Sequence, residues 1–128
     1  MHTSTNSLSS NAYFSHRKGE SVVMKGHTGP VRSVRFSNDG KLLITASDDK
    51  LVKIWSLPSR RFLCSLSGHS NWVQDAKFSP DNKLAVSGGE DKLVKLWDVE
   101  THQNTYTFHD HNEYAFLLHL ISKPTCVV

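Results

Sequence analysis

The apolar residues of this chain fall into short runs that polar turns separate. The runs occupy residues 31–36, 42–46, 52–55, 62–66, 73–78, 84–86, 94–97 and 105–108. They are rich in Val, Ile, Leu and aromatic side chains, and turn-forming residues such as Asp39-Gly40 and Pro58-Ser59 lie between them. Runs this short, with turns at regular intervals, predict strands and an all-β fold.

The two halves of this pattern are copies of each other. When the sequence is shifted along itself so that Gly26 falls on Gly68, Gly26–Trp55 aligns with Gly68–Trp97 without a gap, and fourteen of the thirty positions are identical. A second shift by the same number of residues places His69 on His111, where a third unit begins. A period of about 40 residues with four strands per unit predicts the blades of a β-propeller. The apolar runs supply both faces of each sheet, as expected for sheets packed between neighbours.

Gly26–Trp55 and Gly68–Asp98 resemble the WD40 repeat. The resemblance implies a hydrogen-bonded chain inside each blade, from Trp to Ser/Thr to His to Asp. The two sets are His27, Thr45, Asp49 and Trp55, and His69, Ser87, Asp91 and Trp97. Burial of such a network is tolerable because every donor finds an acceptor. A catalytic His–Asp–Thr trio is the alternative, but a trio that recurs once per unit favours a structural role.

The repeat frame divides the chain into five parts. We expect a disordered polar tail over 1–17, the outer strand of a preceding blade over 18–25, and WD40 repeats over 26–67 and 68–109. Residues 110–128 begin a third, divergent repeat that lacks the later strands. Two complete blades plus flanking strands cannot close a ring of about four to eight blades. We therefore expect a fragment or truncated form that self-associates through open blade edges.

The start of the innermost strand is where WD40 propellers often present a partner-binding surface. Trp72 occupies this position in the second repeat, and exposed Trp and Tyr side chains are enriched at interface hot spots. Packing of Trp72 between blades is the alternative. The candidate partner-binding residues are Pro30, Arg32, Asp48, Trp72, Gln74, Glu90 and Tyr114.

The net charge and the lack of metal-binding or phosphate-binding motifs limit the functions that the sequence supports. The net charge of +3 suits an acidic protein partner, but no Lys/Arg block accompanies it, so we expect no nucleic acid. Cys64 and Cys126 have no metal-site spacing, Arg60-Arg61 is interpreted as a solvated pair, and no phosphate-binding glycine loop occurs. We therefore expect no catalytic residues, no metal and no cofactor. Without a signal peptide or a membrane-spanning run, we expect a cytoplasmic location and no membrane contact.

Several stretches resemble one WD40 branch, the centriolar "protein of centriole" family. They are Lys18–Ser21, Val31–Val34, Thr45–Lys50, Arg61–Leu66, and Asn71–Val73 with Ala76–Asp81. The resemblance implies part of a seven-bladed propeller that helps to build centrioles, basal bodies and cilia, with centriolar or microtubule-associated partners on the cytoskeleton. Gly88-Gly89-Glu90 departs from that branch. A ubiquitin-ligase substrate receptor or another signalling scaffold is the alternative. A propeller hydrolase would need polar residues that converge on a central channel.

Overall fold

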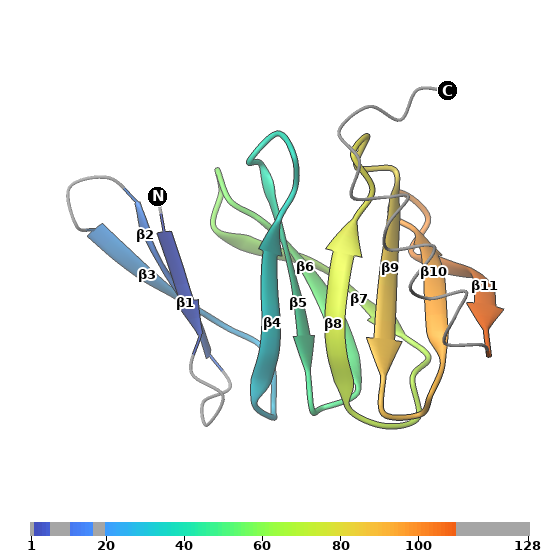
Figure 1. Cartoon of the computed structure of the whole chain (residues 1–128). Coiled ribbons are helices and arrows are strands. Elements are labelled where there is room, and N and C mark those ends of the chain that lie inside the picture. Colours follow the sequence, from blue (N-terminus) through green and yellow to red (C-terminus); the bar gives the residue numbers. More distant parts are fainter. Residues whose placement is uncertain (1, 6–10, 17–19, 110–128) are drawn as a thin grey trace.

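A computed structural model describes residues 2–5, 11–16 and 20–109 of the protein, with side chains from residue 21 onward. The described residues form strands and no helix, and these strands make three antiparallel sheets (Figure 1). The strands are β1 (His2–Thr5), β2 (Asn11–His16), β3 (Glu20–Lys25), β4 (Val31–Phe36), β5 (Leu42–Ser47), β6 (Leu51–Ser56), β7 (Arg61–Ser67), β8 (Val73–Phe78), β9 (Leu84–Gly89), β10 (Val94–Asp98) and β11 (Gln103–Phe108).

Two of the sheets are four-stranded meanders, which we call blade 1 and blade 2. Blade 1 has the order β4-β5-β6-β7, and blade 2 has the order β8-β9-β10-β11. The two sheets lie side by side, with β8 packed against β4 and β5 (Figure 1). The predicted all-β fold with two complete four-stranded blades is confirmed, and β4 and β8 begin and end at the predicted residues.

The sequence repeat extends to the backbone conformation of the turns. Left-handed residues occur in pairs at equivalent positions of the two repeats: Gly40 (φ 73°) with Asn82 (φ 63°), Lys50 (φ 74°) with Lys92 (φ 65°), and Arg60 (φ 57°) with His102 (φ 64°). The residue type changes in two of these pairs while the conformation is kept. A tight turn between twisted strands needs one residue with positive φ, and glycine or asparagine adopts it at least cost.

The core lies mainly between the two blades. Ile44, Ile54 and Leu66 of blade 1 pack with Phe78 and Trp97 of blade 2, and all five are buried. Successive residues of a strand point to opposite faces of the sheet. On the opposite face of blade 1, Leu43, Trp55 and Leu57 accordingly form a second layer with Met24 of β3 in the first sheet. Blade 1 is therefore apolar on both faces, as the sequence predicts.

Two strands lie within the region 1–17, for which the sequence predicts a disordered tail. Residues 2–5 and 11–16 form strands, and β2 pairs in register with β3 along its whole length. The strand that we expected at the outer edge of a preceding blade is thus the edge strand of a three-stranded sheet, in the order β1-β2-β3. The sequence prediction used side-chain polarity alone, and the expected disorder of this tail stays a prediction. Ladder hydrogen bonds join main-chain groups, which every sequence supplies.

Candidate protein-interaction site

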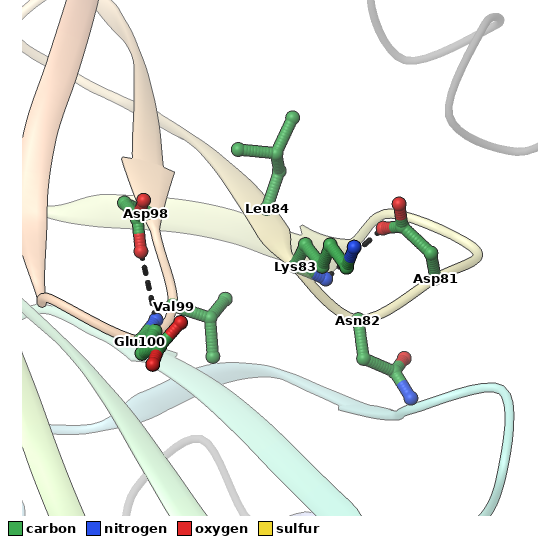
Figure 2. A pocket seen from close by; sticks show the side chains of 7 residues that line it. All are labelled: Asp81, Asn82, Lys83, Leu84, Asp98, Val99 and Glu100. Atoms are coloured by element: carbon green, nitrogen blue, oxygen red, sulfur yellow. Dashed lines mark hydrogen bonds between the residues drawn. The ribbon is translucent and has the colours of Figure 1, made fainter.

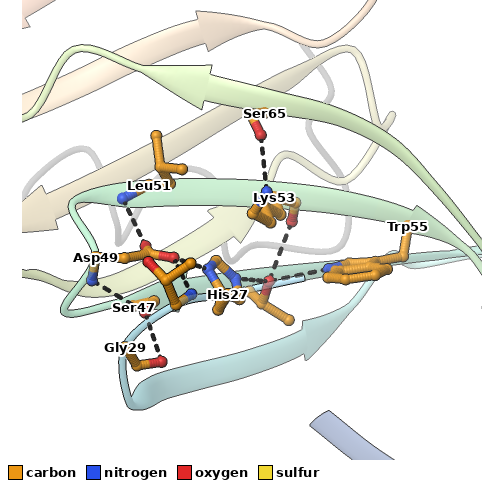
Figure 3. Close-up of polar contacts among 10 residues, drawn as sticks. His27, Gly29, Ser47, Asp49, Leu51, Lys53, Trp55 and Ser65 are labelled. Carbon is orange, nitrogen blue, oxygen red and sulfur yellow. Dashed lines mark hydrogen bonds and ion pairs between the residues drawn. The ribbon is translucent and has the colours of Figure 1, made fainter. Parts of the chain in front are cut away.

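A chain of four side chains runs through blade 1 (Figure 3). The Trp55 indole Nε1 donates to the Thr45 hydroxyl over 3.0 Å, and this hydroxyl lies 2.6 Å from His27 Nε2. His27 Nδ1 lies 2.8 Å from Asp49 Oδ2. His27 belongs to the loop before β4, Thr45 to β5, Asp49 to the β5–β6 turn and Trp55 to β6. The chain therefore ties the loop that enters the blade to two of its strands.

The charge of His27 sets the direction of these hydrogen bonds. Burial lowers the pKa of His27, and the hydrogen bond with Asp49 does not offset this effect, so the ring is neutral at pH 7. A neutral imidazole that donates from Nδ1 must accept at Nε2. The Thr45 hydroxyl therefore donates to His27 and accepts from Trp55. Every buried polar group of the chain then has a partner, which removes the cost of burying it.

Asp49 anchors the other end of the chain. Burial raises the pKa of Asp49, but the hydrogen bonds from His27 and from the Thr28 and Leu51 amides together outweigh it, so the pKa lies below the usual value. The carboxylate is therefore ionised at pH 7. It holds the ring tautomer and closes the β5–β6 turn at the same time.

Blade 2 repeats this chain with serine in place of threonine. Trp97 Nε1 donates to Ser87 Oγ over 2.8 Å, Ser87 Oγ lies 2.7 Å from His69 Nε2, and His69 Nδ1 lies 2.8 Å from Asp91 Oδ2. Burial again lowers the pKa of the histidine. Thr45 is 0% exposed and Ser87 is 1% exposed, so neither hydroxyl can reach a substrate. The two buried hydroxyls therefore fit a structural role and not that of a nucleophile.

Five of the predicted partner-binding residues gather at the end of the two blades where β4 and β8 begin, the lower end in Figure 1. We call them the blade-end surface: Arg32, Asp48, Trp72, Gln74 and Glu90. Arg32 donates from Nε and Nη2 to the two carboxylate oxygens of Asp48 over 2.7 and 2.6 Å. In blade 2 the Gln74 amide donates to the Glu90 carboxylate. The two pairs occupy equivalent places in the two repeats.

Trp72 joins the two halves of the blade-end surface. The Arg32 guanidinium carbon lies 5.4 Å from the centroid of the Trp72 ring, within the range of a cation–π interaction. Trp72 nevertheless remains 47% exposed. Trp72 thus contacts the neighbouring blade and still presents half of its surface to solvent, and its role in partner binding stays a prediction.

Gly89 makes room for the main chain at Trp72. A Cβ at position 89 would lie 2.7 Å from the Trp72 carbonyl oxygen and 3.1 Å from both His69 Nδ1 and Asp91 Oδ1. The Trp72 oxygen accepts the Glu90 amide over 2.7 Å. The first repeat has Ser47 at the equivalent position, so the departure at Gly89 has a steric reason in the second repeat.

The two remaining candidates are Pro30 and Tyr114. Pro30, the equivalent of Trp72 in the first repeat, is partly buried, and its carbonyl oxygen accepts the Asp48 amide over 3.0 Å. Tyr114 lies outside the described residues, as does His111. Pro30 therefore supports the turn that carries Asp48 and contributes little side-chain surface.

An ion pair between the blades was missed by the sequence analysis. Arg35 Nε and Nη2 donate to the two Asp75 carboxylate oxygens, each over 2.9 Å, and Ser33 Oγ donates to Asp75 Oδ1 over 2.7 Å. Burial raises the pKa of Asp75, but the hydrogen bonds from Arg35 and Ser33 outweigh it and lower the pKa below the usual value. Ser33 and Asp75 are equivalent positions that differ in charge, but this difference does not identify Arg35 as the partner of Asp75.

The repeats are matched by a family model. The model of the WD domain, G-beta repeat (WD40) matches residues 19–56 and 60–98, more than half of the chain. The chain belongs to the WD40 repeat family. Proteins of this family generally act as non-catalytic scaffolds that bind other proteins, so the repeats indicate a protein-interaction role.

Individual relatives share about one WD40 repeat with this chain. A WD repeat-containing protein SL1-17 of Schistosoma mansoni is 47% identical over 45 residues, which are 35% of this chain and 15% of that protein. Ribosome biogenesis protein BOP1 homologs of Drosophila erecta and Drosophila melanogaster are each 50% identical over 42 residues, 33% of this chain and 5% of those proteins. The chain thus spans a small part of the length of these relatives.

The opposite end of blade 2 has a shallow depression of about 610 Å³ between the β8–β9 and β10–β11 turns (Figure 2). Two of its carboxylates stabilise the turns, since Asp81 accepts the Lys83 amide and Asp98 accepts the Glu100 amide.

No group of three or more metal-ligating side chains occurs among the described residues. The same part of the chain contains no helix that is long and apolar enough to cross a membrane.

Proposed function

We propose that the blade-end surface binds a partner protein. One observation carries this proposal: Trp72 is half exposed although it sits where two blades meet, with Arg32 on one side and Glu90 next to it in the following turn. A large aromatic ring beside charged groups is the typical centre of a protein interface. No requirement of the fold leaves such a ring in solvent, since the equivalent position holds a proline.

Contacts within the protein fix the side chains of the blade-end surface in the absence of a partner. Arg32 is fixed by two hydrogen bonds to Asp48 and lies over Trp72, and Gln74 is fixed to Glu90. The partner therefore meets side chains whose rotamers are already ordered, which reduces the entropic cost of association. Two carboxylates against one guanidinium leave a slight acidic excess, which favours a partner surface with a basic residue beside an apolar one.

Photo-crosslinking tests the proposal in cells. A photoreactive residue in place of Gln74, an exposed member of the blade-end surface, leaves Trp72 intact and is expected to capture partner proteins. The same residue in place of Lys41, an exposed position in the turn at the opposite end of blade 1, is expected to capture none of them. Equal capture at both positions would count against the blade-end surface.

The substitution Trp72→Ala then tests the role of the ring. We expect partner affinity to fall about tenfold or more, as at an interface hot spot, while the thermal unfolding midpoint changes little because half of the ring is already exposed. Loss of the fold would instead show that Trp72 acts by holding the blades together.

We further propose that the partner belongs to a centriole or basal body. This rests on the sequence resemblance of stretches such as Arg61–Leu66 and Ala76–Asp81 to the centriolar branch, and it implies a cytoplasmic, cytoskeletal location. A second candidate is an assembly in ribosome biogenesis, because several similar proteins carry that name. Localisation of the tagged chain separates the two: colocalisation with centrioles supports the first, and cosedimentation with pre-ribosomal particles overturns it.

A further inference from the structure

A second exposed patch lies on the outermost strand of blade 1, away from the blade-end surface. Phe62 is 47% exposed and Leu63 is 50% exposed, next to the exposed Arg60 and Arg61. We call these four residues the outer-strand patch. Single exposed apolar residues are ordinary on protein surfaces. Two consecutive large ones beside two arginines form a combined apolar and basic surface.

The fold does not require this chemistry. The register of β6 and β7 shifts between Ile54 and Trp55, which leaves Leu63 unpaired in a β-bulge. Blade 2 has the same shift at the equivalent place, where Thr105 is unpaired. There the four equivalent residues are polar: His102, Gln103, Asn104 and Thr105. The same bulged backbone therefore holds four polar residues in blade 2 and the outer-strand patch in blade 1.

The Phe62 ring is held in a fixed orientation. It forms a T-shaped pair with Trp55 at a centroid distance of 5.6 Å, and Lys53 Nζ lies 4.6 Å from its centroid. Lys53 Nζ is itself fixed by a hydrogen bond of 3.2 Å to Ser65 Oγ. The exposed part of Phe62 is thus a rigid apolar platform, which loses little entropy on binding.

The two arginines of the patch make no ion pair within the part of the chain that the structure describes. Arg32 and Arg35 elsewhere in the protein each hold a carboxylate with two hydrogen bonds. A planar guanidinium favours this two-pronged pairing with carboxylates. Arg60 and Arg61 can therefore form the same paired hydrogen bonds with a carboxylate of another molecule.

We propose that the outer-strand patch is a second docking surface, for an acidic segment of a partner protein in which Asp or Glu residues adjoin large apolar side chains. The carboxylates pair with Arg60 and Arg61, and the apolar side chains cover Phe62 and Leu63. The bulge at Leu63 interrupts the regular edge of β7, and such bulges oppose the addition of a further strand. The contact is therefore made by side chains.

A membrane or a nucleic acid fits the patch less well. Membrane recognition through charge uses clusters of about four to eight basic residues, and nucleic-acid binding uses a comparably extended basic surface. Here two arginines flank an apolar pair, and Lys53 is already engaged with Phe62 and Ser65. Carboxylates spaced along an apolar segment match this arrangement.

Fluorescence anisotropy on the complete chain tests the proposal. The probe is a labelled synthetic peptide that alternates Glu with Leu and Phe, and the two comparison peptides replace Glu by Gln or the apolar residues by Ser. We expect binding of the first peptide that weakens with added salt, and at least tenfold weaker binding of the other two.

The matched variants take their residues from blade 2. Arg60→His with Arg61→Gln, and Phe62→Asn with Leu63→Thr, each introduce side chains that the same backbone carries at His102, Gln103, Asn104 and Thr105. Each pair is expected to weaken peptide binding about tenfold while Trp72-dependent partner binding stays unchanged. Circular dichroism checks the fold of each variant.

Charge reversal gives a test that does not depend on the apolar pair. Arg61→Glu lies on the surface, and it is expected to abolish binding of the Glu peptide and to create binding of a peptide with Lys in place of Glu. Unchanged binding in all variants would overturn the proposal. So would binding to phosphatidylserine vesicles in place of the peptide, because the patch would then be a lipid surface. Failure of Trp72→Ala to affect partner binding would count against the blade-end surface alone.

Discussion

Arg35 of blade 1 binds Asp75 of blade 2 with two hydrogen bonds of 2.9 Å each, so the two innermost strands are joined by a side-chain clamp as well as by apolar packing. Asp75 also accepts from Ser33 and from its neighbouring amide at Ala76. The Asp75 side chain is 28% exposed and that of Arg35 is 46% exposed. Solvent therefore screens the pair, and its contribution to stability is modest.

Asp75→Asn is expected to lower the free energy of unfolding at pH 7 by about 1 kcal/mol. The pKa of Asp75 is lower in the folded protein than the ordinary value of 3.8. The stabilisation is therefore complete above about pH 5 and is lost as the pH falls through the folded pKa. Urea titrations at several pH values should show a difference between wild type and variant that shrinks below pH 4. A difference that stays constant with pH would contradict the charge-based account.

Thr45→Val is expected to destabilise the protein by about 1–3 kcal/mol, because it leaves Trp55 Nε1 and His27 Nε2 buried without a hydroxyl partner. The control is Thr45→Ser, which keeps the hydroxyl and copies Ser87 of the second repeat. It should lose much less than Thr45→Val in the same denaturant titration. Equal losses would show that the methyl group, and not the hydrogen-bonded chain, stabilises this position.

The sequence predicted features within a single repeat, but it did not predict the contacts between one sheet and the next. The apolar pattern predicted the bounds of β4 and β8, and the resemblance to the WD40 repeat implied the eight residues of the two hydrogen-bonded chains. The contacts Arg35–Asp75 and Arg32–Trp72 were not predicted. They depend on how one sheet is stacked on the next, and the residue pattern of each single strand carries no information about that.

The tautomers of His27 and His69 provide a direct test by NMR. Burial lowers the pKa of both rings below the ordinary value of 6.5, and Nδ1 of each faces a carboxylate. We expect both imidazoles to be neutral Nδ1–H tautomers at pH 7, as measured by ring nitrogen shifts. The urea-unfolded chain is the control, in which they should titrate near the ordinary value. A signal from the Nε2–H tautomer or from a charged ring at pH 7 would show that the hydroxyls do not donate to the histidines.

The pH dependence of stability follows from the same shift. A histidine whose folded pKa is depressed contributes stability that is complete above its unfolded pKa, and this contribution is lost as the pH falls through the folded value. The free energy of unfolding is therefore expected to decline when the pH is lowered from 7 through the region just below the ordinary histidine pKa of 6.5.

Gly89→Ala is expected to displace the main chain at Trp72, because its Cβ would lie 2.7 Å from the Trp72 carbonyl oxygen. Backbone atoms cannot yield as the end of a flexible side chain can, so we expect a loss of about 1–3 kcal/mol in stability and a shift in Trp72 fluorescence. Gly40→Ala is the comparison for a glycine with open space around it, where the strain comes only from its φ of 73°. Unchanged fluorescence in Gly89→Ala would show that the carbonyl relaxes freely.

His27 and His69 precede the first strands of their blades, and their direct partners lie in the second strand and in the turn after it. Each of the repeats 26–67 and 68–109 therefore contains one whole sheet together with its own hydrogen-bonded chain. An in-frame duplication or deletion of one repeat length would add or remove one complete sheet and leave the hydrogen-bonded chain of every other sheet intact. The number of blades can therefore change without any change in the side chains that hold each blade together.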